Sequence, residues 1–262
     1  MSRYAAMFQR LGGAGAFGAF VMLGDPDLAT SAAILDALVE GGADMIEVGI
    51  PFSDPIADGP TIQAAAERAL KAGVTPADCF ALLRRFRERH SQVPVGVLTY
   101  ANLVLANGRD SFYARCAEAG VDSLLVADVP VFEAEPFVAA ARNYGVAPVL
   151  IAAPNTPAPT LRRIAALGEG YTYCVARAGV TGAETEMKLD HGRLFALLAD
   201  YGAPPPVLGF GISRPDHVRA ALAAGAAGVI SGSAIVRLIE TGLKPVDDLR
   251  AFVAKMKSSC RS

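Results

Sequence analysis

The chain has 262 residues, of which 52% are hydrophobic and 19% charged, and its formal net charge is −2 at pH 7. This composition predicts a soluble globular protein, offers no basic surplus for binding nucleic acid, and contains no stretch of about 20 strongly apolar residues that would span a membrane. The four cysteines are scattered without metal-ligand spacing, which indicates reduced thiols in a cytoplasmic protein.

The chain opens with a helical pattern, followed by eight short apolar runs. In residues 3–11, "RYAAMFQRL", Tyr4, Phe8 and Leu11 share one face, so this helix would suit as a cap over the bottom of a barrel. Continuous apolar runs are typical of parallel strands that are buried on both faces. The predicted strands are residues 17–22, 44–49, 94–99, 122–127, 147–152, 171–176, 205–209 and 227–231.

Stretches with helical period and helix-end signals lie between most of these runs. Residues 31–42 place apolar side chains on one face and end in paired glycines. In the next helix Thr75 is the expected N-cap residue, with Pro76 and Asp78 at the first and third helical positions. Later, Ser213 and Asp216 are spaced like a capping box.

Alternating strands and helices fit either an open, doubly wound sheet or a closed barrel. Eight strands within about 250 residues favour the barrel. No linker divides the chain, so we expect residues 1–262 to form a single α/β domain, a (β/α)8 TIM barrel with an N-terminal capping helix. In such barrels the chemistry lies where strands end and the following loops begin.

Carboxylates occur at and after the end of the second predicted strand. Glu47 interrupts the apolar run, and it either forms an ion pair to a nearby loop or is a buried acid with a raised pKa that can exchange a proton. Asp58, in the loop "SDPIADGPT", either caps a turn or accepts a hydrogen bond from a substrate N–H. Two carboxylates with different tasks are expected of acid and base partners. Asp54 is either a turn residue or a contact to a partner.

Glycine-rich segments follow the seventh and eighth predicted strands. "LGFGIS" (208–213) and "SGSAIV" (231–236) could simply form tight turns. Together, however, they lie in the two loops that bind phosphate in many barrels, where backbone N–H groups and a helix N-terminus favour an anion. The polar loop at residues 177–192 is either a lid over the substrate or an ordinary surface loop.

Aromatic and histidine residues give weaker signals. Phe20, Tyr100, Tyr173 and Phe210 fall at strand ends, where they either pack in the core or line a slot for a flat ring. The three histidines lie on helix ends or loops without an apparent carboxylate partner, so the sequence predicts no metal site.

Several motifs resemble those of the tryptophan synthase α-subunit family. "EVGIPFSDPIADGPTIQ" (47–63) is similar to the family's "ELGIPFSDPLADGPTIQ"-type segment. The family's order continues with "YANLV" (100–104), "LVADVP" (125–130), "GYTYCVARAGVTGAE" (170–184), "GFGIS" (209–213) and "ISGSAIV" (230–236). The resemblance covers essentially the whole chain. One departure is Met22, which stands where many members have threonine.

The resemblance implies a lyase of tryptophan biosynthesis that cleaves indole-3-glycerol phosphate to indole and glyceraldehyde 3-phosphate by a retro-aldol reaction, with no metal or organic cofactor in this subunit. It implies that Glu47 protonates the indole ring carbon, that Asp58 binds the indole N–H and that Tyr173 lies beside Glu47. The residues implied around the indole are Phe20, Leu98, Tyr100, Leu125 and Phe210. Those implied at the phosphate are Gly182, Gly211, Gly232 and Ser233, and those in the lid are Arg177 and Thr181.

The resemblance also implies a partner, the tryptophan synthase β subunit. That subunit would carry pyridoxal phosphate and receive indole through a tunnel in an α2β2 heterotetramer. Two alternatives remain: a phosphate-binding barrel enzyme that works alone, and a non-catalytic subunit that only activates its partner. The paired carboxylates without a catalytic lysine, and the loops that face the β subunit in the family, argue against the first alternative. The presence of Glu47, Asp58 and Tyr173 argues against the second.

Overall fold

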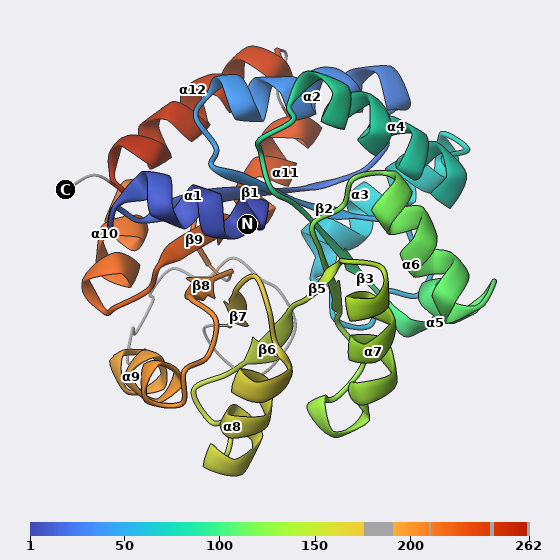
Figure 1. Cartoon of the computed structure of the whole chain (residues 1–262). Helices are drawn as coiled ribbons and strands as arrows, with labels where there is room; N and C mark the ends of the chain where they lie inside the picture. The colour runs from blue at the N-terminus through green and yellow to red at the C-terminus, as the bar shows by residue number, and fades with distance from the viewer. Residues whose placement is uncertain (176–190, 210, 242–243, 261–262) are drawn as a thin grey trace.

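Parallel strands form the centre of the molecule in a computed structural model of the chain, which describes residues 1–175, 191–209, 211–241 and 244–260. The strand order is β5-β4-β3-β2-β1-β9-β8-β7-β6. The two end strands, β5 and β6, are separated by one residue, so the sheet curls into a nearly closed barrel surrounded by helices (Figure 1). This architecture confirms the predicted (β/α)8 fold. The strands are β1 (Ala16–Met22), β2 (Met45–Gly49), β3 (Val95–Thr99), β4 (Ser123–Val126), β5 (Ala147–Pro148), β6 (Leu150–Ala152), β7 (Thr172–Cys174), β8 (Pro206–Leu208) and β9 (Gly228–Ser231).

The fifth predicted strand, residues 147–152, is divided at Val149. β5 pairs with β4 and β6 pairs with β7, and the Val149 N–H still donates to the Leu124 carbonyl at 3.0 Å. Pro148 has no N–H to give to the ladder, which accounts for an interruption at this point. The barrel therefore has eight strand positions. One of them is occupied by β5, which pairs with β4, and then by β6, which pairs with β7.

The helices are α1 (Arg3–Leu11), α2 (Leu28–Glu40), α3 (Pro60–Lys71), α4 (Pro76–Arg89), α5 (Ala101–Leu105), α6 (Arg109–Glu118), the 3₁₀ turn η1 (Val131–Glu133), α7 (Glu135–Asn143), α8 (Ala158–Leu167), α9 (Gly192–Asp200), α10 (Pro215–Ala223), α11 (Ser233–Thr241) and α12 (Pro245–Ser258). Three of them, α3, α5 and α11, are additional helices that come before α4, α6 and α12.

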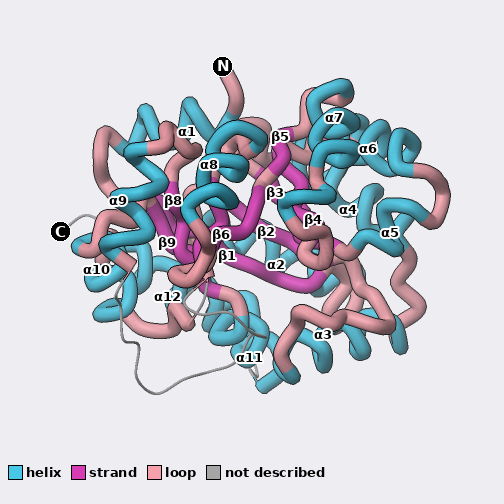
Figure 2. The backbone as a smooth tube through the Cα atoms, turned by 90° about the horizontal axis from the view of Figure 1, so that it is seen from below, coloured by secondary structure: helices cyan, strands magenta, loops and turns pink. Residues whose placement is uncertain are grey.

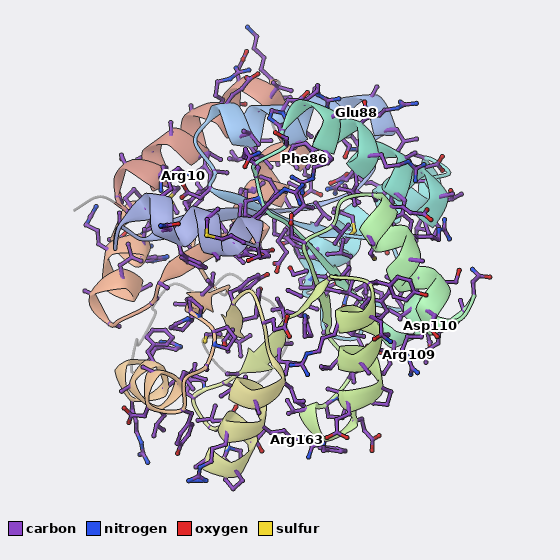
Figure 3. The ribbon with its side chains drawn as sticks, in the orientation of Figure 1. Arg10, Phe86, Glu88, Arg109, Asp110 and Arg163 are labelled. Carbon is purple, nitrogen blue, oxygen red and sulfur yellow. The ribbon has the colours of Figure 1, made fainter. Side chains whose placement is uncertain are left out.

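Helix α4 follows its prediction closely. Thr75 accepts from the Asp78 N–H, and the Asp78 carboxylate accepts from the Thr75 N–H, so both halves of a capping box are present. The Phe86 side chain lies between the helix and the strands, whereas Glu88 is on the solvent side (Figure 3). Burying one apolar stripe in this way fixes the helix against the barrel.

Two predictions about helix ends and histidines are wrong. Arg214, not Ser213, is the N-cap residue of α10, and Asp216 forms an ion pair with Arg214 at 2.9 Å. The Asp216 carboxylate that a capping box would have used therefore binds the Arg214 guanidinium instead. His90 does have a carboxylate partner, because its Nε2 lies 2.7 Å from Oδ1 of Asp36. Asp36 is on α2, 54 residues earlier in the chain.

Helix α1 covers the N-terminal end of the barrel, as predicted. The Tyr4 hydroxyl lies 2.8 Å from Ser123 Oγ at the start of β4, and the Tyr4 ring lies 5.3 Å from that of Tyr171 just before β7. Figure 2 shows α1 at one end of the barrel and α3 and α11 at the other. We call the end opposite α1 the mouth of the barrel.

Two further observations concern the cysteines and the lengths of the helices. All four cysteines are buried and carry free thiols, in agreement with the expected reduced state. Within the parts of the chain that the structure describes, every helix is too short or too polar to cross a lipid bilayer.

Candidate active site

Glu47 lies inside the barrel on β2 and is only 1% exposed. Its neighbours in register are Phe20 on β1 and Gly96 on β3. The Tyr171 hydroxyl donates to Glu47 Oε1 at 2.7 Å, while Oε2 is buried without a hydrogen-bond partner among the described residues. One carboxyl oxygen is thus held in place and the other remains available to a substrate atom.

The surroundings of Glu47 change its acidity. Burial raises the pKa of Glu47 to about 7, and the hydrogen bond from Tyr171 opposes this rise. At neutral pH the acid and carboxylate forms then have similar populations, as proton exchange requires. Glu47 makes no ion pair with a described residue, so the alternative of a structural ion pair is not supported.

Gly96 makes room for the tyrosines below Glu47. A Cβ atom added at Gly96 would lie 2.8 Å from Ser123 Oγ and 3.0 Å from the Tyr4 hydroxyl. We therefore expect Gly96→Ala to lower the free energy of unfolding by about 1–3 kcal/mol, measured by urea denaturation. Gly192→Ala is the control, because the nearest atom there is 3.8 Å away. Equal losses in the two variants would contradict this account of Gly96.

Asp58 lies in the loop between β2 and α3 and is buried. Burial raises its pKa to about 6, opposed by the Tyr100 hydroxyl, which approaches the carboxyl without reaching full hydrogen-bond geometry. Gln63 donates to the Asp58 backbone carbonyl at 2.7 Å, and the Phe52 and Tyr100 rings stack with centroids 5.5 Å apart. These contacts hold the loop, so Asp58 has a fixed position despite lying outside regular structure.

Tyr173, on β7, lies near both carboxyl groups. Its hydroxyl donates to the Gly209 carbonyl at 2.9 Å rather than to Glu47. Burial raises the pKa of Tyr173 well above its usual value, and the charges of Glu47 and Asp58 raise it further. The side chain is therefore a neutral phenol close enough to both carboxylates to feel their charges.

Several of the residues predicted around a flat ring belong to one cluster inside the barrel, whereas Tyr100 lies outside it and stacks on Phe52. Phe20, Leu125 and Tyr173 are buried members of it, and Leu98 packs against them. Met22 belongs to the same cluster, where its Cε and Sδ occupy the space beside Gly49. Met22 pairs in register with Gly49, two residues after Glu47 on β2. Its side chain, larger than the threonine of many family members, therefore fills space at that end of the strand. Phe210 lies outside the described residues.

The predicted phosphate loops lie at the mouth end. Gly211 has a φ of +75°, a conformation that favours glycine, and the His217 Nδ1–H donates to its carbonyl at 2.9 Å. Ser233 is the first residue of α11, and Gly232 lies against Phe20, with an added Cβ 3.6 Å from the Phe20 Cβ. Arg177, Thr181 and Gly182 lie outside the described residues.

One important contact was not predicted, the hydrogen bond between Tyr171 and Glu47. Alternation along "YTYC" places Tyr171 and Tyr173 on the same face of the strand, which is a signal the sequence does contain. What the sequence does not contain is the depth of each side chain in the barrel. That depth depends on how the strands are staggered, and it puts Tyr171 rather than Tyr173 against the Glu47 carboxyl.

Three large apolar side chains are exposed on the segments that follow three neighbouring strands. Ile56 and Phe132 are each 71% exposed and Leu105 is 49% exposed. Ile56 follows β2, Leu105 follows β3 and Phe132 follows β4. The Asp128 carboxylate, after β4, accepts from the Ala101 N–H at 2.8 Å and so fixes the start of α5. A groove of about 450 Å³ lies between residues 126–131 and 149–151, and Phe132 follows its lining directly in the chain. Large apolar side chains exposed on neighbouring segments are typical of a protein contact surface.

Comparison with known proteins gives a consistent result. A family model described as tryptophan synthase alpha chain matches residues 8–261. The tryptophan synthase alpha chain of Shewanella amazonensis is 55% identical over 260 residues, covering 98% of this chain and 97% of that protein. A Mycobacterium tuberculosis tryptophan synthase structure aligns with a TM-score of 0.89 at 31% identity, covering 100% and 99% of the two chains. A tryptophan synthase complex from Pyrococcus furiosus aligns with a TM-score of 0.84 at 38% identity, covering 92% and 97%.

Proposed function

The chain belongs to the tryptophan synthase alpha chain family, and on that basis we propose that Glu47 and Asp58 carry out the retro-aldol cleavage of indole-3-glycerol phosphate. The reaction of the family yields indole and glyceraldehyde 3-phosphate, which makes this chain a carbon–carbon lyase of tryptophan biosynthesis. The observation that carries the assignment is the pair of buried acids at one barrel mouth, with pKa values of about 7 and about 6.

The proposed chemistry balances with two carboxyl groups. Glu47 donates its proton to the ring carbon that bears the glycerol phosphate chain, and the Asp58 carboxylate accepts the hydrogen bond of the indole N–H as positive charge develops on the ring. The carbon–carbon bond then breaks and its electron pair restores the aromatic ring. The adjacent hydroxyl becomes the aldehyde, and its proton returns to the Glu47 carboxylate.

The remaining groups would bind and orient the substrate. Phe20, Leu98, Leu125 and Tyr173 supply an apolar slot for the indole, to which the resemblance adds Tyr100 and Phe210. Gly211, Gly232 and Ser233 would offer backbone N–H groups to the phosphate at the N-terminus of α11, together with Gly182. Arg177 and Thr181 would belong to a loop that closes over the site.

We expect the pH profile of kcat/KM to be bell-shaped, with limbs near pH 6 and pH 7. Activity falls below about pH 6 as Asp58 takes up a proton, and above about pH 7 as Glu47 loses the proton it must donate. Tyr171→Phe removes a hydrogen bond that lowers the pKa of Glu47, so the basic limb should move to higher pH. Tyr113→Phe, at a buried tyrosine on α6, is the control. A basic limb that does not move in Tyr171→Phe would show that Glu47 does not control it.

The partner in this proposal is the tryptophan synthase β subunit, which would carry pyridoxal phosphate and receive the indole. Support comes from the exposed Ile56, Leu105 and Phe132 beside the mouth. The test measures indole release from indole-3-glycerol phosphate with and without added β subunit. We expect release in both cases and a faster rate with the partner, and Ile56→Asp should weaken that stimulation. Full activity without any response to the β subunit would favour the stand-alone enzyme, and no indole in either case would favour the pure activator.

A further inference from the structure

A single arginine connects three separate segments at the barrel mouth. Arg68, on α3, donates from Nε and one terminal nitrogen to the two carboxylate oxygens of Asp25 at 2.8 and 2.9 Å. Its other terminal nitrogen donates to Glu240 on α11 at 3.1 Å. The Asp25 side chain has no solvent exposure, so its pairing with Arg68 is built into the core of this region.

The three segments each belong to a different part of the proposed site. Asp25 follows β1, the strand that carries Phe20. Arg68 is on α3, which begins two residues after Asp58 and is fastened to it by the bond from Gln63 to the Asp58 carbonyl. Glu240 is on α11, whose first residue is Ser233 and whose preceding residue is Gly232. The helix α3, the loop with Asp25 and the helix α11 follow β2, β1 and β9, which are neighbours in the sheet.

Helices α3 and α11 have no other described ion pair between them. Both lie at the end of the barrel opposite α1 (Figure 2), and each packs against β1. The two helices also pack against each other, and Arg68 to Glu240 is the one ion pair between their described residues. The two-pronged contact of Arg68 with Asp25 fixes the orientation of the guanidinium as well as its distance from β1. The same guanidinium then reaches α11 through one further bond, to Glu240.

We propose that Arg68 is a positioning residue that sets the distance between the indole end and the phosphate end of the substrate site. The inference rests on the proposed function, because it takes Asp58 as the indole contact and Gly232 with Ser233 as the phosphate contact. A ligand that spans both ends gains from their correct separation, whereas a ligand that occupies one end does not.

The test compares three ligands in one variant. Arg68→Lys keeps a cation beside the buried Asp25, so the protein should still fold, but it cannot make the two-pronged contact. We expect binding of a non-cleavable indole alkyl phosphate, which spans the site, to weaken about tenfold. Binding of indole alone and of glyceraldehyde 3-phosphate alone should stay within about twofold of wild type, because each occupies one end only.

A second pair of variants separates positioning from loss of an ion pair in general. Glu240→Gln removes only the connection to α11 and should weaken the spanning ligand about 2–5-fold, as is typical of a partly exposed pair. Glu40→Gln is the matched control, because Glu40 is a similarly exposed helical partner of Arg250 far from the mouth. It should leave all three affinities unchanged.

The outcomes are distinguishable. An equal loss for all three ligands in Arg68→Lys would mean local collapse and would overturn the inference, as would wild-type affinity for the spanning ligand in both mouth variants. If the wild-type protein itself binds the indole alkyl phosphate no more tightly than it binds either product, the proposed function fails before the role of Arg68 is reached.

Discussion

We expect Glu47→Gln to reduce indole release by about 10²–10⁴-fold, the usual contribution of a positioned proton donor. The amide has nearly the same size as the carboxylic acid and can still accept the hydrogen bond from Tyr171 at Oε1. It has no proton to give to the ring carbon, so bond cleavage loses its first step. Turnover of indole-3-glycerol phosphate, followed by indole release under saturating substrate, measures the loss.

The control for this variant is binding rather than rate. Affinity for a non-cleavable indole alkyl phosphate and for the β subunit should match wild type, because Glu47 is buried and lies away from the exposed mouth loops. Wild-type turnover in a variant that binds normally would end the assignment of Glu47 as the proton donor.

The sequence predicts the position of Glu47 well because two independent patterns agree there. The apolar run places residue 47 within a buried strand, and the count of eight runs places the end of that strand at a barrel mouth. The resemblance to a family then assigns roles to Glu47 and Asp58. The structure adds the physical reason that these acids can act near neutral pH, namely burial with a single neutral phenol against each carboxyl.

Contacts made by the tertiary fold are what the sequence does not predict. The Tyr171 to Glu47 bond spans 124 positions, and the Arg68 to Asp25 pair spans 43. His90 and Asp36 meet because α2 and α4 pack side by side, and local propensity carries no signal of that packing. Ser213 was a reasonable N-cap residue by local pattern alone, but the chain enters α10 one residue later, at Arg214.

We expect Asp58→Asn to lower kcat by about 10²–10³-fold, a loss typical of removing one charged group that stabilises a developing charge. Asparagine keeps an oxygen that can accept from the indole N–H, so substrate binding should change less than the rate. What it lacks is the negative charge that opposes the positive charge on the ring during protonation. The loss should therefore appear mainly in kcat, with a smaller change in KM.

Stability separates this catalytic role of Asp58 from a structural one. Burial raises the folded-state pKa of Asp58 to about 6, above its usual value of 3.8, so keeping the carboxyl ionised costs the folded state free energy that is fully felt above about pH 6. The neutral asparagine avoids that cost, and urea denaturation at pH 8 should show Asp58→Asn to be at least as stable as wild type. At pH 3 the Asp58 carboxyl is mostly protonated in both the folded and the unfolded state, so this difference in stability between wild type and Asp58→Asn should disappear. A variant that lost activity and stability together at pH 8 would instead identify Asp58 as a residue that holds the loop.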